Sequence, residues 1–193
     1  MSAEATVAAA PGYPLRYDVE YPEELSRWLI FVKWLFAFPH YVILYLIQVG
    51  NLPIAAVLTI LFRRKYPRWW FDFLVRLLRY ENRIGAYLFL LRDDFPALEE
   101  EQAVHLDVHY PESLNRWLPL VKWLLAIPHI IVLLFLFIGA LVALVIAWFA
   151  ILFTKRFPRG LFDFVVGVNR WGLRVSAYAF YLFTDEYPPF SLR

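Results

Sequence analysis

Charged side chains line one face of two segments that are otherwise apolar. At 100° per residue, the charged positions fall within about 60° of one another in residues 69–91 and within about 40° in residues 161–183. They are Asp72, Arg76, Arg79 and Arg83 in the first segment, and Asp163, Arg170 and Arg174 in the second. A narrow charged stripe on an apolar helix is typical of a helix that turns its stripe toward a partner.

These arginines are therefore candidates for binding an anionic group such as a lipid phosphate, because clustered guanidinium groups need acceptors. Asp72 and Asp163 would then serve as internal counter-charges. The same stripe also fits two further roles. The first is structural ion pairing, with long side chains that reach back to the membrane surface, and the second is proton or ion conduction.

Two histidines follow prolines at corresponding places, in Pro39-His40 and Pro128-His129. Such a pair could ligate a haem from opposite faces, whereas an imidazole at the membrane edge accounts for the same pattern. His105 and His109 share a strand face, but they are a weak candidate for a zinc site, because their repeat counterparts are Arg16 and Glu20. We expect no metal and no cofactor.

The composition argues against an enzyme and for a membrane protein. The chain has no Cys and only 7 Gly, and it carries no nucleophile motif, phosphate-binding loop or paired catalytic carboxylates. Hydrophobic residues make up 61% of its 193 residues, against about 45–50% in soluble domains, and mean hydropathy is +0.53. A net charge of +2 is too small to suggest nucleic acid as a partner, and we expect none.

The chain contains a long internal match. Residues 18–28, DVEYPEELSRW, recur 89 positions later at 107–117 as DVHYPESLNRW. Beyond the apolar run the offset becomes 91, so that Tyr66-Pro67-Arg68 corresponds to Phe157-Pro158-Arg159. Such self-similarity predicts a tandem duplication. We expect a flexible N-terminal tail over 1–12 that is not a signal peptide, a first repeat over 13–98 and a second over 99–193.

The order of motifs resembles the DUF4389 family of bacterial membrane proteins. The motifs are DVxYPExLxRW, VKWLLAIPH, a long apolar run, FPRGLFDFVVG and TDEYPPFSL, and the resemblance covers nearly all of residues 13–193, once per repeat. The first repeat departs from the pattern at Trp69-Trp70, Asn51 and Pro53. Since this family has no known function, the resemblance implies a multi-pass protein of the bacterial cell (inner) membrane and no catalytic residues.

Each repeat predicts four elements. Alternating residues predict a strand at 15–20 and at 104–109, and the two strands could pair outside the bilayer. An interfacial amphipathic helix follows at 23–38 and 112–127, and it breaks at the proline. A membrane span is expected at 40–62 and 129–153, and a last helix at 69–91 and 161–183 either spans or lies in the interface. The fold class is all-α integral membrane, with two tandem repeats and about four membrane helices.

Aromatic and basic residues mark the expected membrane surfaces. The interfacial anchors are Arg27, Trp28, Lys33, Trp34, Arg116, Trp117, Lys122 and Trp123. Basic turns at 63–68 and 155–159 would both be cytoplasmic by the positive-inside rule, with the strands outside.

These features favour a non-catalytic scaffold or accessory subunit that organises lipid. Its partners would be membrane lipids, including anionic ones, a larger membrane complex or a second copy of the chain. A transport component with an Arg-lined path between the repeats is the alternative, and a haem-bearing electron carrier is a weaker one.

Overall fold

The computed structural model of the chain describes residues 12–49, 53–97 and 103–193. The expected tail, apart from Gly12, lies outside them, as does the departure at Asn51. The elements are β1 Leu15–Val19, α1 Leu29–Val49, α2 Pro53–Arg63, α3 Arg68–Leu88, β2 Val104–Val108, the 3-10 turn η1 Leu118–Leu120, α4 Lys122–Leu125, α5 Ile127–Thr154 and α6 Arg159–Ala179.

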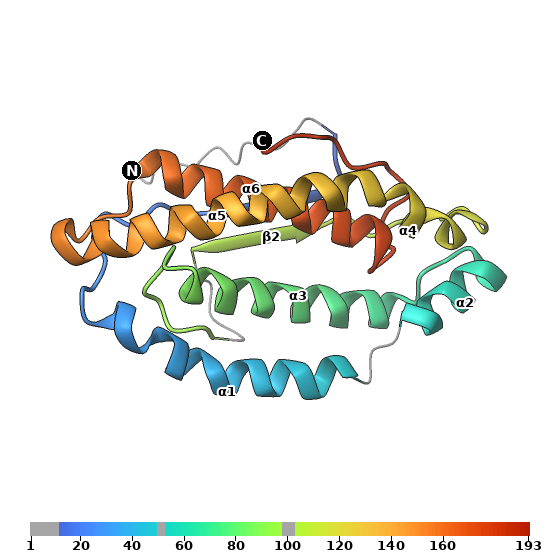
Figure 1. Ribbon diagram of the computed structural model, residues 1–193. Coiled ribbons are helices and arrows are strands. Elements are labelled where there is room, and N and C mark those ends of the chain that lie inside the picture. The colour runs from blue at the N-terminus through green and yellow to red at the C-terminus, as the bar shows by residue number, and fades with distance from the viewer. Residues whose placement is uncertain (1–11, 50–52, 98–102) are drawn as a thin grey trace, which may run out of the picture.

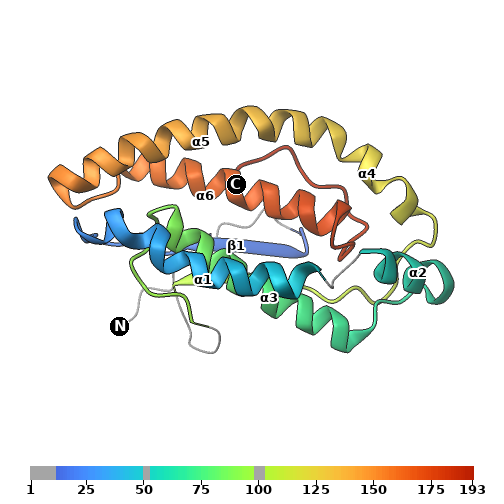
Figure 2. The same ribbon diagram turned by 60° about the horizontal axis from the view of Figure 1, so that its bottom comes forward.

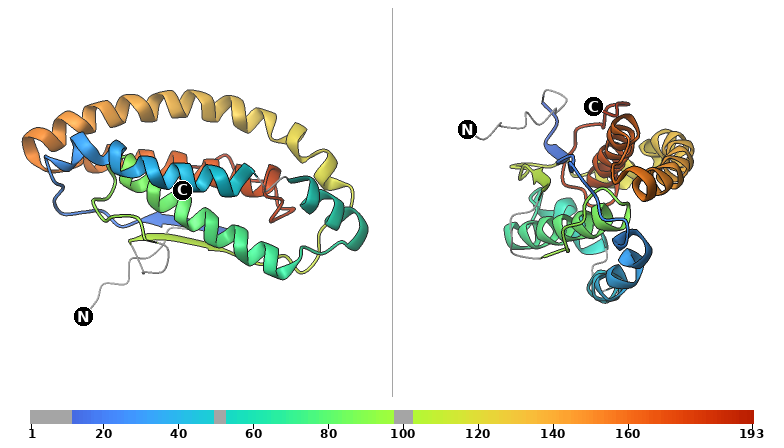
Figure 3. Two further views of the ribbon diagram at one scale, coloured as in Figure 1. Left: turned by 90° about the horizontal axis from the view of Figure 1, so that it is seen from below. Right: turned by 90° about the vertical axis from the view of Figure 1, so that its left-hand side faces the viewer.

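The elements form three layers (Figures 1 and 3). The strands lie on one side, α3 and α6 form the middle, and α1 and α5 lie on the other side. Helix α1 packs on α3, and α5 packs on α6. All four long helices run roughly along one axis, with α5 bowed along the outside (Figure 2). The strands run along the same axis.

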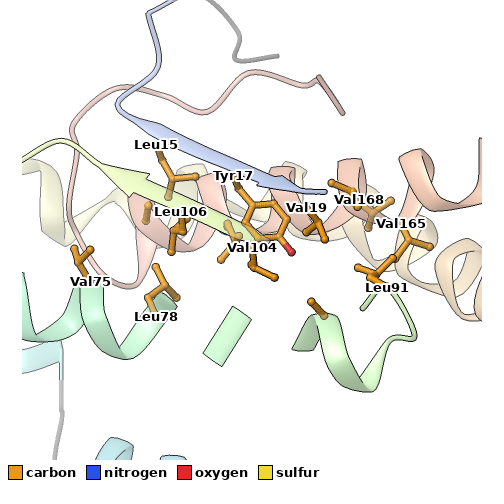
Figure 4. Close-up of a cluster of buried hydrophobic side chains, with 14 of the residues drawn as sticks. Leu15, Tyr17, Val19, Val75, Leu78, Leu91, Val104, Leu106, Val165 and Val168 are labelled. Atoms are coloured by element: carbon orange, nitrogen blue, oxygen red, sulfur yellow. The ribbon is translucent and has the colours of Figure 1, made fainter. Parts of the chain in front are cut away.

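The strands form an antiparallel pair, as the alternating residues predicted. Leu15, Tyr17 and Val19 point to the helical layer and are buried, whereas Arg16 and Glu20 on the opposite face are exposed. Figure 4 shows this core, in which β1 and β2 side chains meet Val75 and Leu78 of α3 and Val165 and Val168 of α6. The sheet therefore covers the hydrophobic core on the side of α3 and α6 that faces away from α1 and α5.

Each strand packs on a helix from the other half of the chain. Strand β1 lies on α6, and β2 lies on α3. The register pairs Tyr17 with Leu106, which are themselves matched positions of the internal repeat. A local two-fold axis thus passes between these two residues and relates the matched contacts of the two halves.

The break expected at Pro39 is absent, whereas α4 ends at Leu125 and α5 begins at Ile127, next to Pro128. The interfacial helix expected at 112–127 is reduced to η1 and α4. Pro39 lies inside α1, so the interfacial helix expected at 23–38 and the span expected at 40–62 are wrong as separate elements. The missing N–H of Pro39 removes one helical hydrogen bond, and α1 nevertheless continues from Leu29 to Val49. Pro128 instead stands in the first turn of α5, where backbone N–H groups have no helical acceptor. The span predicted at 129–153 agrees with α5.

The two basic turns lie at opposite ends of the molecule (Figure 1). The expectation that both face the cytoplasm stays a prediction. The N–H of Leu25, near the start of the first half, donates to the carbonyl of Lys155 at 2.8 Å. The N–H of Leu114 donates in the same way to Arg64, at 3.1 Å. Each end therefore joins the entry segment of one half to the basic turn of the other.

Of the described helices, two are long and apolar enough to cross a membrane, Leu29–Ile47 and Ile127–Thr154, and only 22% of each is buried. Helices α3 and α6 are strongly amphipathic and bury one face in the core.

The sheet core provides a stability prediction. Leu106 is 3% exposed, and its truncation to Ala should lower the free energy of unfolding by about 2–5 kcal/mol, because a cavity remains where the side chain packed. Denaturation in mild detergent measures this. His105→Ala on the outer face of the same strand is the control, with a loss below about 1 kcal/mol. Equal losses of unfolding free energy in the two variants would show that the inner face of the sheet does not pack on the core.

Candidate functional site

The arginine stripe of α6 faces the sheet. Arg170 Nε donates to the carbonyl oxygen of Tyr17 at 2.7 Å, and Nη2 forms an ion pair with Asp18 at 2.9 Å. Its Nη1 donates to the carbonyl of Leu192 at 3.0 Å. One guanidinium thus ties β1 and the C-terminal segment to the middle of α6.

Arg79 of α3 makes the matched contacts. Its Nε donates to the carbonyl of Leu106 at 2.8 Å, and its Nη2 pairs with Asp107 at 3.2 Å. Arg79 is more exposed than Arg170, with a side chain 42% exposed against 10%. The Arg79 pair is therefore the better solvated of the two.

The remaining stripe arginines contact other segments. Arg83 Nη1 donates to the carbonyl of Ala97, and Arg174 Nη1 donates to that of Arg193, both at 2.6 Å. Arg174 is fully buried, with its guanidinium 5.7 Å from the Tyr13 ring centroid. Arg76 is exposed. The stripe thus meets backbone acceptors and strand carboxylates, and its binding of a lipid phosphate stays a prediction.

The aspartates of the stripe have other partners than expected. Asp72 forms an ion pair with Arg68 at 3.6 Å, and Asp163 forms one with Arg159 at 3.3 Å, each one helical turn away. The carboxylates that pair with Arg79 and Arg170 come instead from the strands. Helical spacing alone could not show this, because the strand partners are distant in sequence.

Two predicted anchor lysines are buried. Lys33 pairs with Asp93, and Lys122 pairs with Asp185, both at 2.7 Å, and each ammonium also donates to a backbone carbonyl at 2.6 Å. Burial lowers the pKa of Lys122, which Asp185 opposes. The prediction that Lys33 and Lys122 anchor the protein at the lipid headgroups is therefore corrected, because both side chains are buried inside the protein. The repeated Val-Lys-Trp and acidic-aromatic-Pro motifs carried the signal for the pairing.

The other expected anchors lie near the surface. Trp28, Trp34, Trp117 and Trp123 are all more than half exposed. Arg27 is exposed and donates to the carbonyl of Phe153 at 2.9 Å, and Arg116 is half-buried. These residues are placed where they could meet headgroups.

The matched histidines each meet an aromatic residue of their own half. His40 Nδ1 is hydrogen-bonded to the Tyr80 hydroxyl, and His129 Nδ1 accepts from Trp171 Nε1 at 3.1 Å. His129 also stacks on Phe190. Within the described ranges, no group of three or more His, Cys, Asp or Glu could hold a metal ion.

A cavity of about 450 Å³ lies between the two helical hairpins, and the sequence did not predict it. Its walls are mainly apolar, and its polar side chains are Tyr41, Glu81, Asn82, Asn169, Ser176 and Tyr181. Asn169 Nδ2 donates to the Tyr17 hydroxyl at 3.0 Å and to Asn82 Oδ1 at 3.4 Å. The Tyr181 hydroxyl donates to Glu81 Oε2 at 3.4 Å. These side chains come from both halves of the chain, and they meet only in the tertiary structure.

Arg79 and Arg170 each hold a strand carbonyl and a strand carboxylate, and these two arginine clamps should contribute unequally to stability. Arg170→Gln should lower the free energy of unfolding by about 2–4 kcal/mol, because it leaves buried carbonyl oxygens and Asp18 without their donor. Arg79→Gln, the matched variant, should cost about 1 kcal/mol or less, since its pair is solvated. Thermal and urea unfolding in detergent compare the two. A larger loss for Arg79→Gln would contradict the unequal burial of the clamps.

Comparison with known proteins gives a domain family for part of the chain and no activity. Neither a curated protein nor a solved structure matches the chain. A family model does match, described as a domain of unknown function, DUF4389, over residues 117–191. This range covers η1, α4, α5, α6 and the C-terminal segment that returns over α6. By this match, residues 117–191 are similar to the DUF4389 domain, the family that the motifs predicted.

Proposed function

We propose that this protein is a non-catalytic scaffold that lies along the membrane plane and organises lipid. In this arrangement α1 and α5 are immersed in the hydrocarbon of one leaflet, α3 and α6 lie at headgroup depth, and the sheet faces water. This replaces four crossing helices with two immersed and two interfacial ones.

The position of the sheet carries the proposal. Tyr17 and Leu106 contact Arg170 and Arg79, which are near the middle of α6 and α3. If the helices crossed the bilayer, the charged outer face of the sheet would stand at mid-membrane. A charge there costs about 3 kcal/mol on insertion scales, and that face carries several. Lying flat, the same face meets water.

The outer helices support immersion. At 100° per residue, the exposed positions of α5 between Ile127 and Phe153 cover roughly 220° of its circumference, and all are apolar. Its 28 residues would extend about 42 Å, longer than a hydrocarbon core of about 30 Å. Helix α1 likewise exposes apolar side chains, including Phe38, Tyr45 and Leu46. Exposing an apolar surface of this size to water is unfavourable, and immersion in a lipid leaflet removes this cost.

Both ends of the molecule suit the headgroup region. One end carries Arg63, Arg64, Lys65 and Trp117, and the other carries Arg27, Trp28, Lys155 and Arg156. Basic and tryptophan side chains are favoured at this depth, where anionic lipids attract the cations. We therefore propose lipids, anionic ones included, as the first partners.

Immersion in one leaflet gives the scaffold its mechanical effect. Two helices that occupy hydrocarbon on one side widen that leaflet, and this favours bending. A bacterial cell membrane and the origin of the halves by duplication belong to the same proposal. An Arg-lined transport path is less supported, because Arg170 and Arg174 contact the strand and the C-terminal segment.

Sidedness tests the flat arrangement. The chain has no Cys, so a single introduced Cys is a unique label site. Lys65→Cys and Lys155→Cys, at opposite ends of the molecule, should both react with an impermeant maleimide from the same side of sealed vesicles. Arg16→Cys on the sheet should react from that side as well. Leu141→Cys on α5 is the protected control. Labelling of positions 65 and 155 from opposite sides would show that the helices cross.

Membrane deformation tests the scaffold role. Purified protein added to liposomes should produce tubules or smaller vesicles by electron microscopy, because it widens one leaflet. Phe135→Asp with Leu141→Asp should abolish this, since each Asp costs about 3 kcal/mol in hydrocarbon. His109→Asp, on the sheet face, is the control that should still deform vesicles. Bound wild-type protein that leaves liposomes unchanged would count against the role.

A further inference from the structure

The cavity between the hairpins is polar at one end and apolar at the other. Its inner end lies beneath the sheet, where Asn169 contacts the buried Tyr17 hydroxyl. Its rim includes Tyr41 of α1 and Leu134 and Phe137 of α5, whose side chains are exposed on the apolar layer. The cavity therefore opens on the face that we place in hydrocarbon and deepens toward the water side.

A second, apolar cavity of about 150 Å³ continues from the first. The two share Phe89, Phe137 and Asn169, and the second is otherwise lined by aliphatic side chains such as Leu144 and Val165. Together they offer a polar site beside a narrow apolar channel. This is the shape and polarity of an amphiphile with its head toward the aqueous side.

The polar residues of the cavity stand where the two halves differ. Matched positions, 91 residues apart, place Leu78 opposite Asn169, Asn82 opposite Leu173, and Glu81 opposite Gly172. Each helix thus forms with an apolar residue or Gly at the place where the other carries a polar one. The polar residues are consequently not required to build the helical hairpin, yet all of them converge on one cavity.

The charges of the cavity select the headgroup. No Lys, Arg or His occurs among the described residues that line it, and Glu81 is its carboxylate. A phosphate or a fatty-acid carboxylate would lose its hydration beside a like charge without gaining a cation, which is costly. Hydroxyl groups instead suit a site of amide, hydroxyl and carboxylate groups, because they both donate and accept.

The hydroxyl of Tyr181 stays a donor in this site. Burial raises the pKa of Tyr181, and the charge of Glu81 raises it further, so the phenol keeps its proton at physiological pH. Tyr181 therefore donates to Glu81, and the amides of Asn82 and Asn169 line the same cavity.

We propose that this cavity binds a lipid with a small, uncharged, hydroxyl-bearing head, the chemistry of mono- and diacylglycerol. The head contacts Glu81, Asn82 and Asn169, and an acyl chain runs past Phe137 into the apolar channel. The inference rests on the proposed flat arrangement for the direction in which the lipid enters. It adds a specific ligand to what would otherwise be a general lipid surface.

Photo-crosslinking tests the site in phosphatidylcholine vesicles that contain a diacylglycerol with a diazirine on one acyl chain. Cross-links mapped by mass spectrometry should fall on residues lining the channel, such as Phe89, Phe137 and Leu144. Asn82→Leu and Asn169→Leu place in each helix the residue that the matched helix already carries. Each should reduce cross-linking about 5- to 10-fold through loss of a hydrogen-bonding partner, whereas Asp72→Asn on the surface of α3 should not.

Competing lipids test the headgroup class. Unlabelled monooleoylglycerol should suppress the cross-links, whereas phosphatidic acid or oleylamine at the same mole fraction should not. Equal or stronger competition by phosphatidic acid or oleylamine would overturn the uncharged class. Cross-links spread over the outer face of α5 and unchanged in both Asn→Leu variants would overturn the site.

Flotation of every variant with the vesicles separates this inference from the proposed function. Variants that float like the wild type but lose cross-linking support the site, and circular dichroism confirms that they are folded. If the wild type does not float, the flat membrane arrangement fails. The same cross-linking in detergent micelles then decides the site, because channel cross-links that the Asn→Leu variants lose would uphold it and their absence would refute it.

Discussion

The exchange of strands between the two halves is the constraint on which the structure depends. A two-stranded sheet has little stability by itself, so it must bury one face on other elements. Here each strand lies on the helix of the other half, and the guanidinium groups of Arg79 and Arg170 donate to its carbonyl oxygens. Neither half can complete its core alone. The antiparallel register that follows sets the halves head to tail.

This head-to-tail order determines how the molecule can meet a membrane. It sends the basic turns to opposite ends and places the strands beside the middle of the helices. It also leaves α1 and α5 on one face, with nothing among the described residues covering their outer sides. A polar face opposite an apolar face is the arrangement of a protein that lies at an interface, and our proposals of lipid organisation and of a glyceride-type ligand both start from it.

The matched halves also separate structural chemistry from candidate functional chemistry. The arginine clamps, the buried Lys–Asp pairs and the His–aromatic contacts occur twice, once in each half, as expected of contacts that hold a fold together. The polar groups of the central cavity occur once and lack a polar counterpart. Burying such groups costs stability without an evident gain in packing, which is the reason to assign them to a ligand.

The sequence determined the elements, and the tertiary structure decided how they meet. Period-two alternation predicted both strands, and unbroken apolarity predicted α5, because local patterning reports which face of an element is buried. The contacts that occur twice are made by residues at matched positions of the two halves. The continuation of α1 through Pro39, the strand carboxylates that pair with the arginines and the burial of Lys33 and Lys122 depend on partners distant in the chain. Helical spacing carries no information about such partners, so only the folded arrangement could show them.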